Sequence, residues 1–67
     1  MLRFDGRIDM DRLWANIYPS TMGGVILEIY VQRHGQPLPD LVHLGNYDSE
    51  ENAEKDMRKL FKNVNWR

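Results

Sequence analysis

The sequence predicts an α+β domain in which a three-stranded antiparallel sheet packs against one C-terminal α-helix, in the order β-β-β-α. Three observations predict this fold. Residues 12–18 and residues 25–33 both alternate apolar and polar side chains, with the period of two that is typical of half-buried strands. Residues 41–64 read as a short strand, a glycine corner, a helix cap and an amphipathic helix.

The first full strand is expected over residues 12–18 and ends at Pro19. A loop, PSTMGG, follows it. Gly23 and Gly24 lack the third glycine, the lysine and the following helix of a phosphate-binding loop, so the segment is interpreted as a hairpin connection.

The second strand, VILEIYVQR, is the strongest in the chain because one of its faces is wholly aliphatic. Pro37 and Pro39 cannot donate to a ladder, so HGQPLPD is expected to be a loop. The third strand covers residues 41–44, with Val42 and Leu44 expected on the core side.

Ser49 is expected to cap the helix by accepting a hydrogen bond from a free backbone N–H of the first turn. Glu51 with Lys55, and Glu54 with Arg58, are favourable pairs four residues apart. Apolar residues at helical spacing complete the core. The full expected core is Leu13, Ala15, Ile17, Leu27, Ile29, Val31, Val42 and Leu44 against Ala53, Met57, Leu60, Phe61 and Val64.

The 67 residues are expected to form a single domain. A domain of this size buries only about 60% of its unfolded surface, so its stability should be marginal. Residues 1–9 are interpreted either as a lead-in, with a turn at Asp5-Gly6, or as an extra strand. At the other end, Trp66 is expected to fold back onto the core.

The composition excludes several classes of site. The chain contains no cysteine, which excludes disulfides, thiol catalysis and cysteine-ligated metal sites. Nine Lys and Arg against ten Asp and Glu give no strong overall attraction to nucleic acid or anionic membrane. The N-terminus lacks the apolar core of a signal peptide, and no apolar run would span a bilayer, so a cytoplasmic protein is expected.

Catalysis has no support in the sequence. His34 and His43 lie nine residues apart, which fits no common metal spacing, and the nearby Asp40 is interpreted as a turn residue. Ser20 and Ser49 have no nucleophile motif around them. We therefore expect no enzyme, no catalytic residue, no metal and no cofactor.

The second half of the chain resembles the AP2/ERF DNA-binding domain and the related N-terminal domains of tyrosine-type integrases. In that family a strand ending in AEIR leads to VWLGTF and then to DTxEEAA opening a helix. Here LEI at residues 27–29 matches the first block, and LGNYDSEENA at residues 44–53 carries most of the second. The resemblance implies a three-stranded sheet on one helix that reads duplex DNA with the exposed sheet face. Tyr30 and His43 stand where the family has an arginine and a tryptophan.

The face of the sheet turned away from the helix is expected to be rich in aromatic residues. Such a patch on a small domain is typical of a binding face, although ordinary surface exposure or a face assignment shifted by one residue would also account for it. The expected partner-binding residues are Trp14, Asn16, Tyr18, Ile26, Glu28, Tyr30, Leu41 and His43.

Two functions follow from this face. The first is a small non-enzymatic regulatory or inhibitory module that binds a protein partner or a second copy of itself, in a setting such as a phage or mobile element. The alternative is AP2-like or integrase-like binding of duplex DNA by the same face. Four arginines are the expected phosphate contacts in that case: Arg3, Arg7, Arg12 and Arg33.

Overall fold

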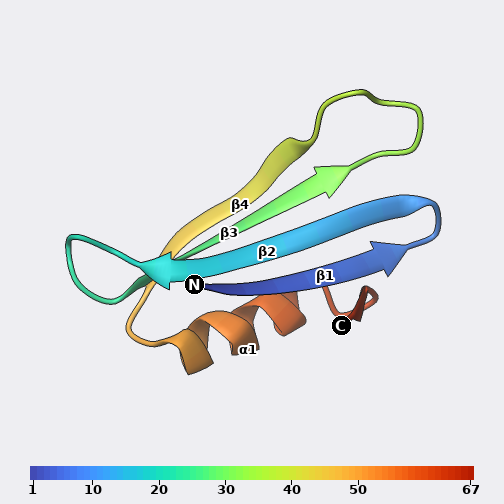
Figure 1. Ribbon diagram of the computed structural model, residues 1–67. Helices are drawn as coiled ribbons and strands as arrows, with labels where there is room; N and C mark the ends of the chain where they lie inside the picture. The colour runs from blue at the N-terminus through green and yellow to red at the C-terminus, as the bar shows by residue number, and fades with distance from the viewer.

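A computed structural model describes all residues, 1–67, as a five-stranded antiparallel sheet with one helix on one of its faces (Figure 1). The strands are β1 (Leu2–Ile8), β2 (Asp11–Pro19), β3 (Val25–Gln32), β4 (Asp40–Tyr47) and β5 (Asn65–Trp66). The helix, α1 (Glu50–Leu60), lies between β4 and β5 in the chain. The α+β class with an antiparallel sheet is confirmed.

The first four strands form a meander, and the last strand returns to its open edge. The order across the sheet is β4-β3-β2-β1-β5. After α1 has crossed under the sheet, the chain turns back and β5 pairs antiparallel with the middle of β1. The prediction of three strands in the order β-β-β-α is therefore wrong, because a strand precedes the three and another follows the helix.

Residues 1–9 form strand β1, the alternative that the sequence left open, rather than a lead-in. Phe4, Gly6 and Ile8 face the helix while the residues between them face away, as β1 pairs with β2 along its whole length. Asp5-Gly6 lies inside the strand, so the turn reading of this dipeptide is wrong. The turn is at Asp9 and Met10, where Asp9 takes a positive φ of 53°.

The core lies between α1 and the inner face of β2 and β3. Three residues of β2 and four of β3 alternate into it, and Ala53 and Met57 meet them from the helix. Phe61 and Trp66 pack against the edge of this cluster. The ten buried hydrophobic residues are Leu13, Ala15, Ile17, Val25, Leu27, Ile29, Val31, Ala53, Met57 and Val64.

Strand β4 presents the opposite face from the one predicted. Leu44 pairs with Glu28, which faces away from the helix, and Leu44 is 62% exposed. A register shift between Ile29 and Tyr30 leaves Val42 as an extra residue, and its side chain is also exposed. The expected core positions of Val42 and Leu44 are therefore wrong, because apolar residues at 41, 42 and 44 fit either face of a strand and the bulge resets their alternation.

The helix begins as predicted. The Ser49 side chain accepts a hydrogen bond from the backbone N–H of Asn52 at 3.2 Å, and Glu50 and Glu51 occupy the first turn. Both predicted charge pairs are present, Lys55 with Glu51 at 3.3 Å and Arg58 with Glu54 at 3.1 Å. The expected core position of Leu60 is wrong: it lies in the last turn of the helix and is half exposed.

The end of the chain is held by Trp66, which folds back as predicted. Its indole Nε1 donates to the Phe61 carbonyl oxygen at 3.3 Å, and the Arg67 N–H donates to the Asp5 carbonyl oxygen at 2.7 Å. Trp66 crosses β1 opposite Gly6, where the absence of a side chain leaves room for the ring. No helix of the structure is long and apolar enough to cross a membrane.

Candidate interaction surface on the exposed sheet face

The sheet has one face that no part of the chain covers, and we call it the outer face. Figure 1 shows α1 on the opposite side of the sheet. The strand pairings place the same-facing residues of neighbouring strands side by side. The outer face consists of Arg3, Asp5, Arg7, Arg12, Trp14, Asn16, Tyr18, Ile26, Glu28, Tyr30, Gln32, Leu41, Leu44 and Asn46.

An aromatic pair occupies the centre of the outer face. Trp14 of β2 and Tyr30 of β3 are direct cross-strand partners, and their rings stack with centroids 5.7 Å apart and planes 20° apart. The Arg3 guanidinium lies 5.6 Å from the Trp14 ring centroid. Stacking and cation–π contacts of this kind are each worth about 0.5–1.5 kcal/mol and hold the rings in place.

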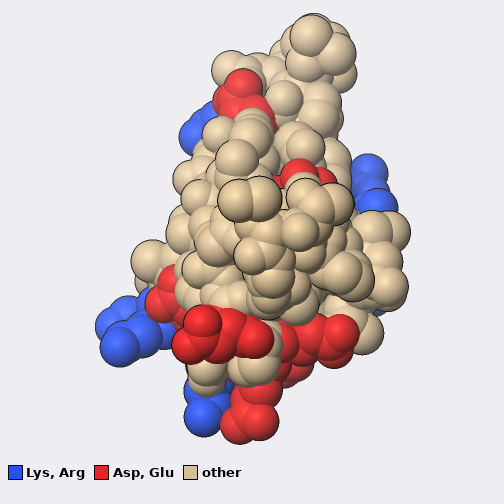
Figure 2. Space-filling view, turned by 90° about the vertical axis from the view of Figure 1, so that its left-hand side faces the viewer, with Lys and Arg blue, Asp and Glu red and all other residues tan.

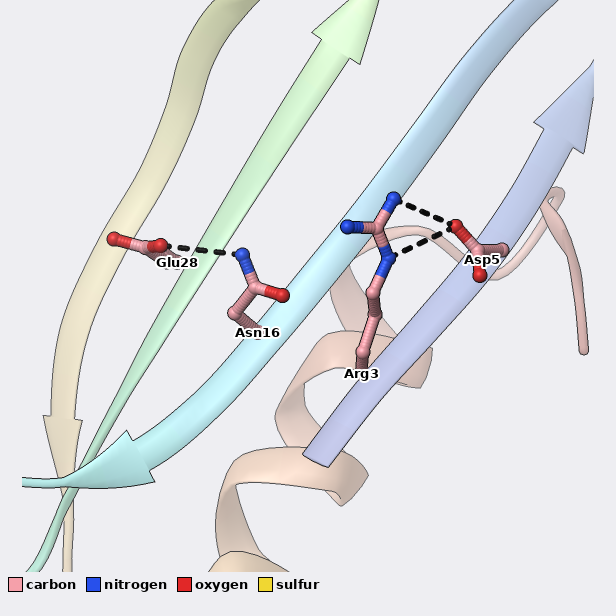
Figure 3. A network of polar contacts seen from close by, with 4 residues as sticks. All are labelled: Arg3, Asp5, Asn16 and Glu28. Atoms are coloured by element: carbon pink, nitrogen blue, oxygen red, sulfur yellow. Dashed lines mark hydrogen bonds and ion pairs between the residues drawn. The ribbon is translucent and has the colours of Figure 1, made fainter. Parts of the chain in front are cut away.

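Polar contacts lie beside the aromatic pair on the outer face. Figure 3 shows two of them: Arg3 pairs with Asp5 of its own strand at 3.2 Å, and Glu28 of β3 accepts from the Asn16 amide at 3.2 Å. Glu28 also accepts from the Tyr18 hydroxyl at 3.1 Å. Partial desolvation, followed by the bond to Glu28, raises the pKa of Tyr18 above its ordinary value of 10.0. The side chains of this face are therefore largely fixed by one another.

One acceptor in this network has no partner. The Asn16 Oδ1 atom is buried and receives no hydrogen bond, and in Figure 3 it points from β2 toward the Arg3 side of the face. A buried acceptor without a donor costs about 1–3 kcal/mol. The hydrogen-bond network of the outer face therefore contains no donor for Asn16 Oδ1.

The β4 side of the outer face is apolar. Leu41 and Leu44 are 48% and 62% exposed, and the half-buried Ile26 of β3 lies diagonal to Leu44, opposite Asn46. The β1 side is charged instead, with Arg3, Asp5 and the facing pair of Arg7 and Arg12. The outer face therefore grades from apolar at β4, through aromatic, to charged at β1.

Acidic side chains collect in the other layer of the molecule. Figure 2 shows them gathered in the lower part of the view, where α1 begins, with the sheet above them largely uncharged. Glu50 and Glu51 are the acidic residues of the first helical turn. Negative charge thus concentrates away from the outer face.

Seven of the eight predicted partner-binding residues share the outer face. Trp14, Asn16, Tyr18, Ile26, Glu28, Tyr30 and Leu41 lie on it. His43 does not: it pairs with Ile29 and faces the helix side, because the same bulge that turned Leu44 outward turned His43 inward. Leu44 belongs to the face and was missed, since it was assigned to the core.

The predicted phosphate contacts are divided between two places. Arg3, Arg7 and Arg12 lie on the outer face, on strands β1 and β2. Arg33 lies beyond the end of β3, in an ion pair with Asp40. Because the sequence left residues 1–9 open between a lead-in and an extra strand, it did not show that β1 carries arginines onto the sheet.

The inward-facing side chains of β4 form a polar cluster against the helix. A ring nitrogen of His43 lies 3.0 Å from the Tyr47 hydroxyl, which donates to Asp56 of α1. A Cβ on Gly45 would come within 3.2 Å of both His43 and Tyr47, so glycine at this position lets the two rings close over the strand. Burial, followed by the bond to Asp56, raises the pKa of Tyr47 to about 12.

This shift makes the contribution of Tyr47 to stability depend on pH. Because the folded pKa is above the ordinary value of 10.0, the stabilisation is complete below pH 10 and is lost as the pH rises to about 12. We expect Tyr47→Phe to lower the free energy of unfolding by about 1–2 kcal/mol at pH 8, since the half-buried Asp56 loses its donor. Urea titrations of the parent protein and of Tyr47→Phe from pH 8 to 12 measure this effect. The difference between their free energies of unfolding should shrink above pH 10. A difference that stays constant would contradict the assignment.

No three His, Cys, Asp or Glu side chains lie close enough together to hold a metal ion. Comparison of the chain with protein-family models, with curated proteins and with solved structures found no match. The function is therefore argued from the outer face itself.

Proposed function

We propose that this protein is a small non-enzymatic regulatory or inhibitory module that binds a protein partner, or a second copy of itself, through the outer face. The observation that carries the proposal is the stacked Trp14–Tyr30 pair at the centre of a sheet face that the rest of the chain leaves uncovered. Tryptophan, tyrosine and arginine are the residues most enriched among the side chains that dominate binding energy at interfaces.

The arrangement of the outer face supports binding at low entropic cost. Trp14 is held between Tyr30 and Arg3, and Glu28 is held by Asn16 and Tyr18. Immobilising a free side chain on binding costs about 0.5–1.5 kcal/mol, and most of these side chains are already immobile. A partner would therefore meet a preformed surface.

The composition of the face also fits an interface. Exposed leucines lie on one side of the aromatic pair, on the edge strand β4, and charged residues lie on the other side, so a partner meets apolar, aromatic and charged contacts on one face.

Duplex DNA is the second candidate, and one observation favours it. Strand β1 adds Arg3 and Arg7 to the same face as Arg12, where the resemblance to AP2 domains places DNA contacts. Glu28 shares that face and would repel phosphate, and Arg3 is already paired with Asp5. The aromatic and apolar part of the face therefore favours the protein partner.

The test is the double variant Trp14→Ala with Tyr30→Ala, compared with Leu60→Ala, which removes an exposed leucine from the helix. We expect the double variant to keep its circular dichroism spectrum and to lose at least about 30-fold in self-association or partner affinity, the effect of truncating anchor residues. Sedimentation measures self-association, and calorimetry measures the affinity for a partner. The Leu60→Ala variant should match the parent protein in both measurements.

Unchanged association in a folded double variant would contradict the protein-partner proposal. Fluorescence anisotropy of a labelled DNA duplex, titrated with the protein at low and at physiological salt, tests the second candidate function, binding of duplex DNA. DNA binding would weaken steeply with salt, with a slope of about −0.9 per phosphate neutralised.

A further inference from the structure

A hollow of about 160 Å³ lies at the corner of the sheet where β5 meets β1. Its lining includes three arginines, Arg7 of β1, Arg12 of β2 and Arg67 after β5, together with Asp5 and Asn65. Trp14 and Tyr30 do not line it. The hollow is therefore distinct from the aromatic centre of the outer face.

None of the ion pairs of the structure involves the three arginines of this corner. The four ion pairs of the structure are Arg3–Asp5, Arg33–Asp40, Lys55–Glu51 and Arg58–Glu54. None of them involves Arg7, Arg12 or Arg67, and the one carboxylate in the lining, Asp5, is taken by Arg3. The side chains lining the hollow thus carry three positive charges against one negative charge.

The strand pairing makes this charge arrangement unfavourable in the absence of a ligand. Arg7 and Arg12 are direct cross-strand partners. Like charges directly opposite one another destabilise a sheet. The return of the chain in β5 adds Arg67 to the same corner, where the Arg67 N–H is held by the Asp5 carbonyl oxygen. An anion between the three guanidinium groups would convert this repulsion into attraction.

We propose that Arg7, Arg12 and Arg67 form a binding site for a terminal phosphate group, that is, the dianion of a phosphate monoester. A guanidinium presents a planar fork of N–H donors that matches phosphate oxygens, often in pairs. A monoester has three free oxygens, one for each arginine, whereas a carboxylate or a phosphodiester has two. The Asn65 amide supplies a further donor at the rim.

The site does not depend on the proposed function. Its ligand is a small phosphate group, and a protein partner bound by the aromatic centre would leave the corner residues unchanged, whereas duplex DNA would engage Arg7 and Arg12 as phosphate contacts. The two proposals can therefore be contradicted separately. Absence of phosphate binding would not contradict the role of Trp14 in partner binding. Unchanged association in the Trp14–Tyr30 double variant would not contradict the role of Arg67 in phosphate binding.

The experiment is a two-dimensional amide NMR titration of the isotope-labelled protein with inorganic phosphate, at constant ionic strength in chloride. We expect saturable shifts confined to the amides around Arg7, Arg12 and residues 65–67, with half-saturation in the millimolar range. Dimethyl phosphate, a diester, should bind at least several-fold more weakly. Lys59→Gln, which removes an exposed helix charge, should titrate like the parent.

The variant Arg12→Gln separates a ligand site from a merely exposed charge. It should lose the phosphate-dependent shifts, yet in chloride its Tm should rise by about 1–5 °C because the repulsion with Arg7 is gone. Absence of saturable shifts in the parent, or equal shifts in Arg12→Gln, would overturn the site. Equal binding of inorganic phosphate and dimethyl phosphate would overturn the choice of a terminal phosphate, and shifts produced only by a DNA duplex would assign the arginines to the second candidate function.

Discussion

Leu27→Ala is expected to lower the free energy of unfolding by about 2–5 kcal/mol, whereas Leu44→Ala should change it by less than about 0.5 kcal/mol. The same atoms are removed in both variants, and only the face of the sheet differs. Leu27 is completely buried between the sheet and α1, while Leu44 is 62% exposed on the outer face.

The size of the first effect makes it decisive for a domain of 67 residues. Total stabilities run at about 0.05–0.15 kcal/mol per residue, so a loss of this size removes much of the folded population. Urea titration followed by circular dichroism measures both variants. Similar losses for Leu27→Ala and Leu44→Ala would mean that Leu44 belongs to the core, as the apolar alternation of the sequence suggested, and that the register of β4 is wrong.

Gly6→Ala is expected to cost about 1–3 kcal/mol and to detach β5 from β1. A Cβ at this position would lie 2.4 Å from Val64 Cγ1 and 2.8 Å from Trp66 Cε3. Neither Val64 nor the indole of Trp66 can yield without moving the returning chain, since the first is buried and the second is anchored to the Phe61 carbonyl oxygen.

Hydrogen exchange gives the readout, because it separates local from global loss. In Gly6→Ala the Arg67 amide, which donates to the Asp5 carbonyl oxygen, should lose protection well before the amides of β2 and β3. Gly35→Ala is the matched control: its φ of +84° makes alanine strained, but no atom lies within 4 Å of the new Cβ. Retained protection at Arg67 in Gly6→Ala would contradict the packing of Trp66 over Gly6.

The elements that local chemistry determines were predictable from the sequence. The aliphatic alternation of β3 and the Ser49 cap of α1 are short-range signals, and both appear in the structure. The two i,i+4 pairs of the helix follow from spacing alone. For the same reason the alternation of β2 correctly placed Trp14 and Tyr18 on the face opposite the core.

The remaining features depend on contacts between distant segments. Strand β5 has two residues, and its pairing with β1 is made by a chain that first crosses the sheet as α1. In β1, the dipeptide Asp5-Gly6 has the composition of a turn. The glycine is there because Trp66 packs over Gly6, where a Cβ would collide with the indole ring. No local pattern contains either fact, which is why the prediction stopped at three strands.

The residues of the candidate site were predicted correctly up to the point in β4 where the alternation of inward and outward side chains is interrupted. The bulge at Val42 moved His43 to the inner face and Leu44 to the outer face, and a single extra residue in a strand leaves no mark in an apolar run. The arginine corner was out of reach because Arg7, Arg12 and Arg67 come together only through the pairing of β1 with both β2 and β5.

The central claim is that the outer face is where this protein meets its partner. The most direct measurement places a photoreactive benzoylphenylalanine at Leu44, exposed on the outer face, or at Lys59, exposed on the helix, in cells that make the protein. We expect a discrete crosslinked adduct, with a second copy or with one other protein, from position 44 and none from position 59. An adduct from position 59 alone, or none from either position, would contradict it.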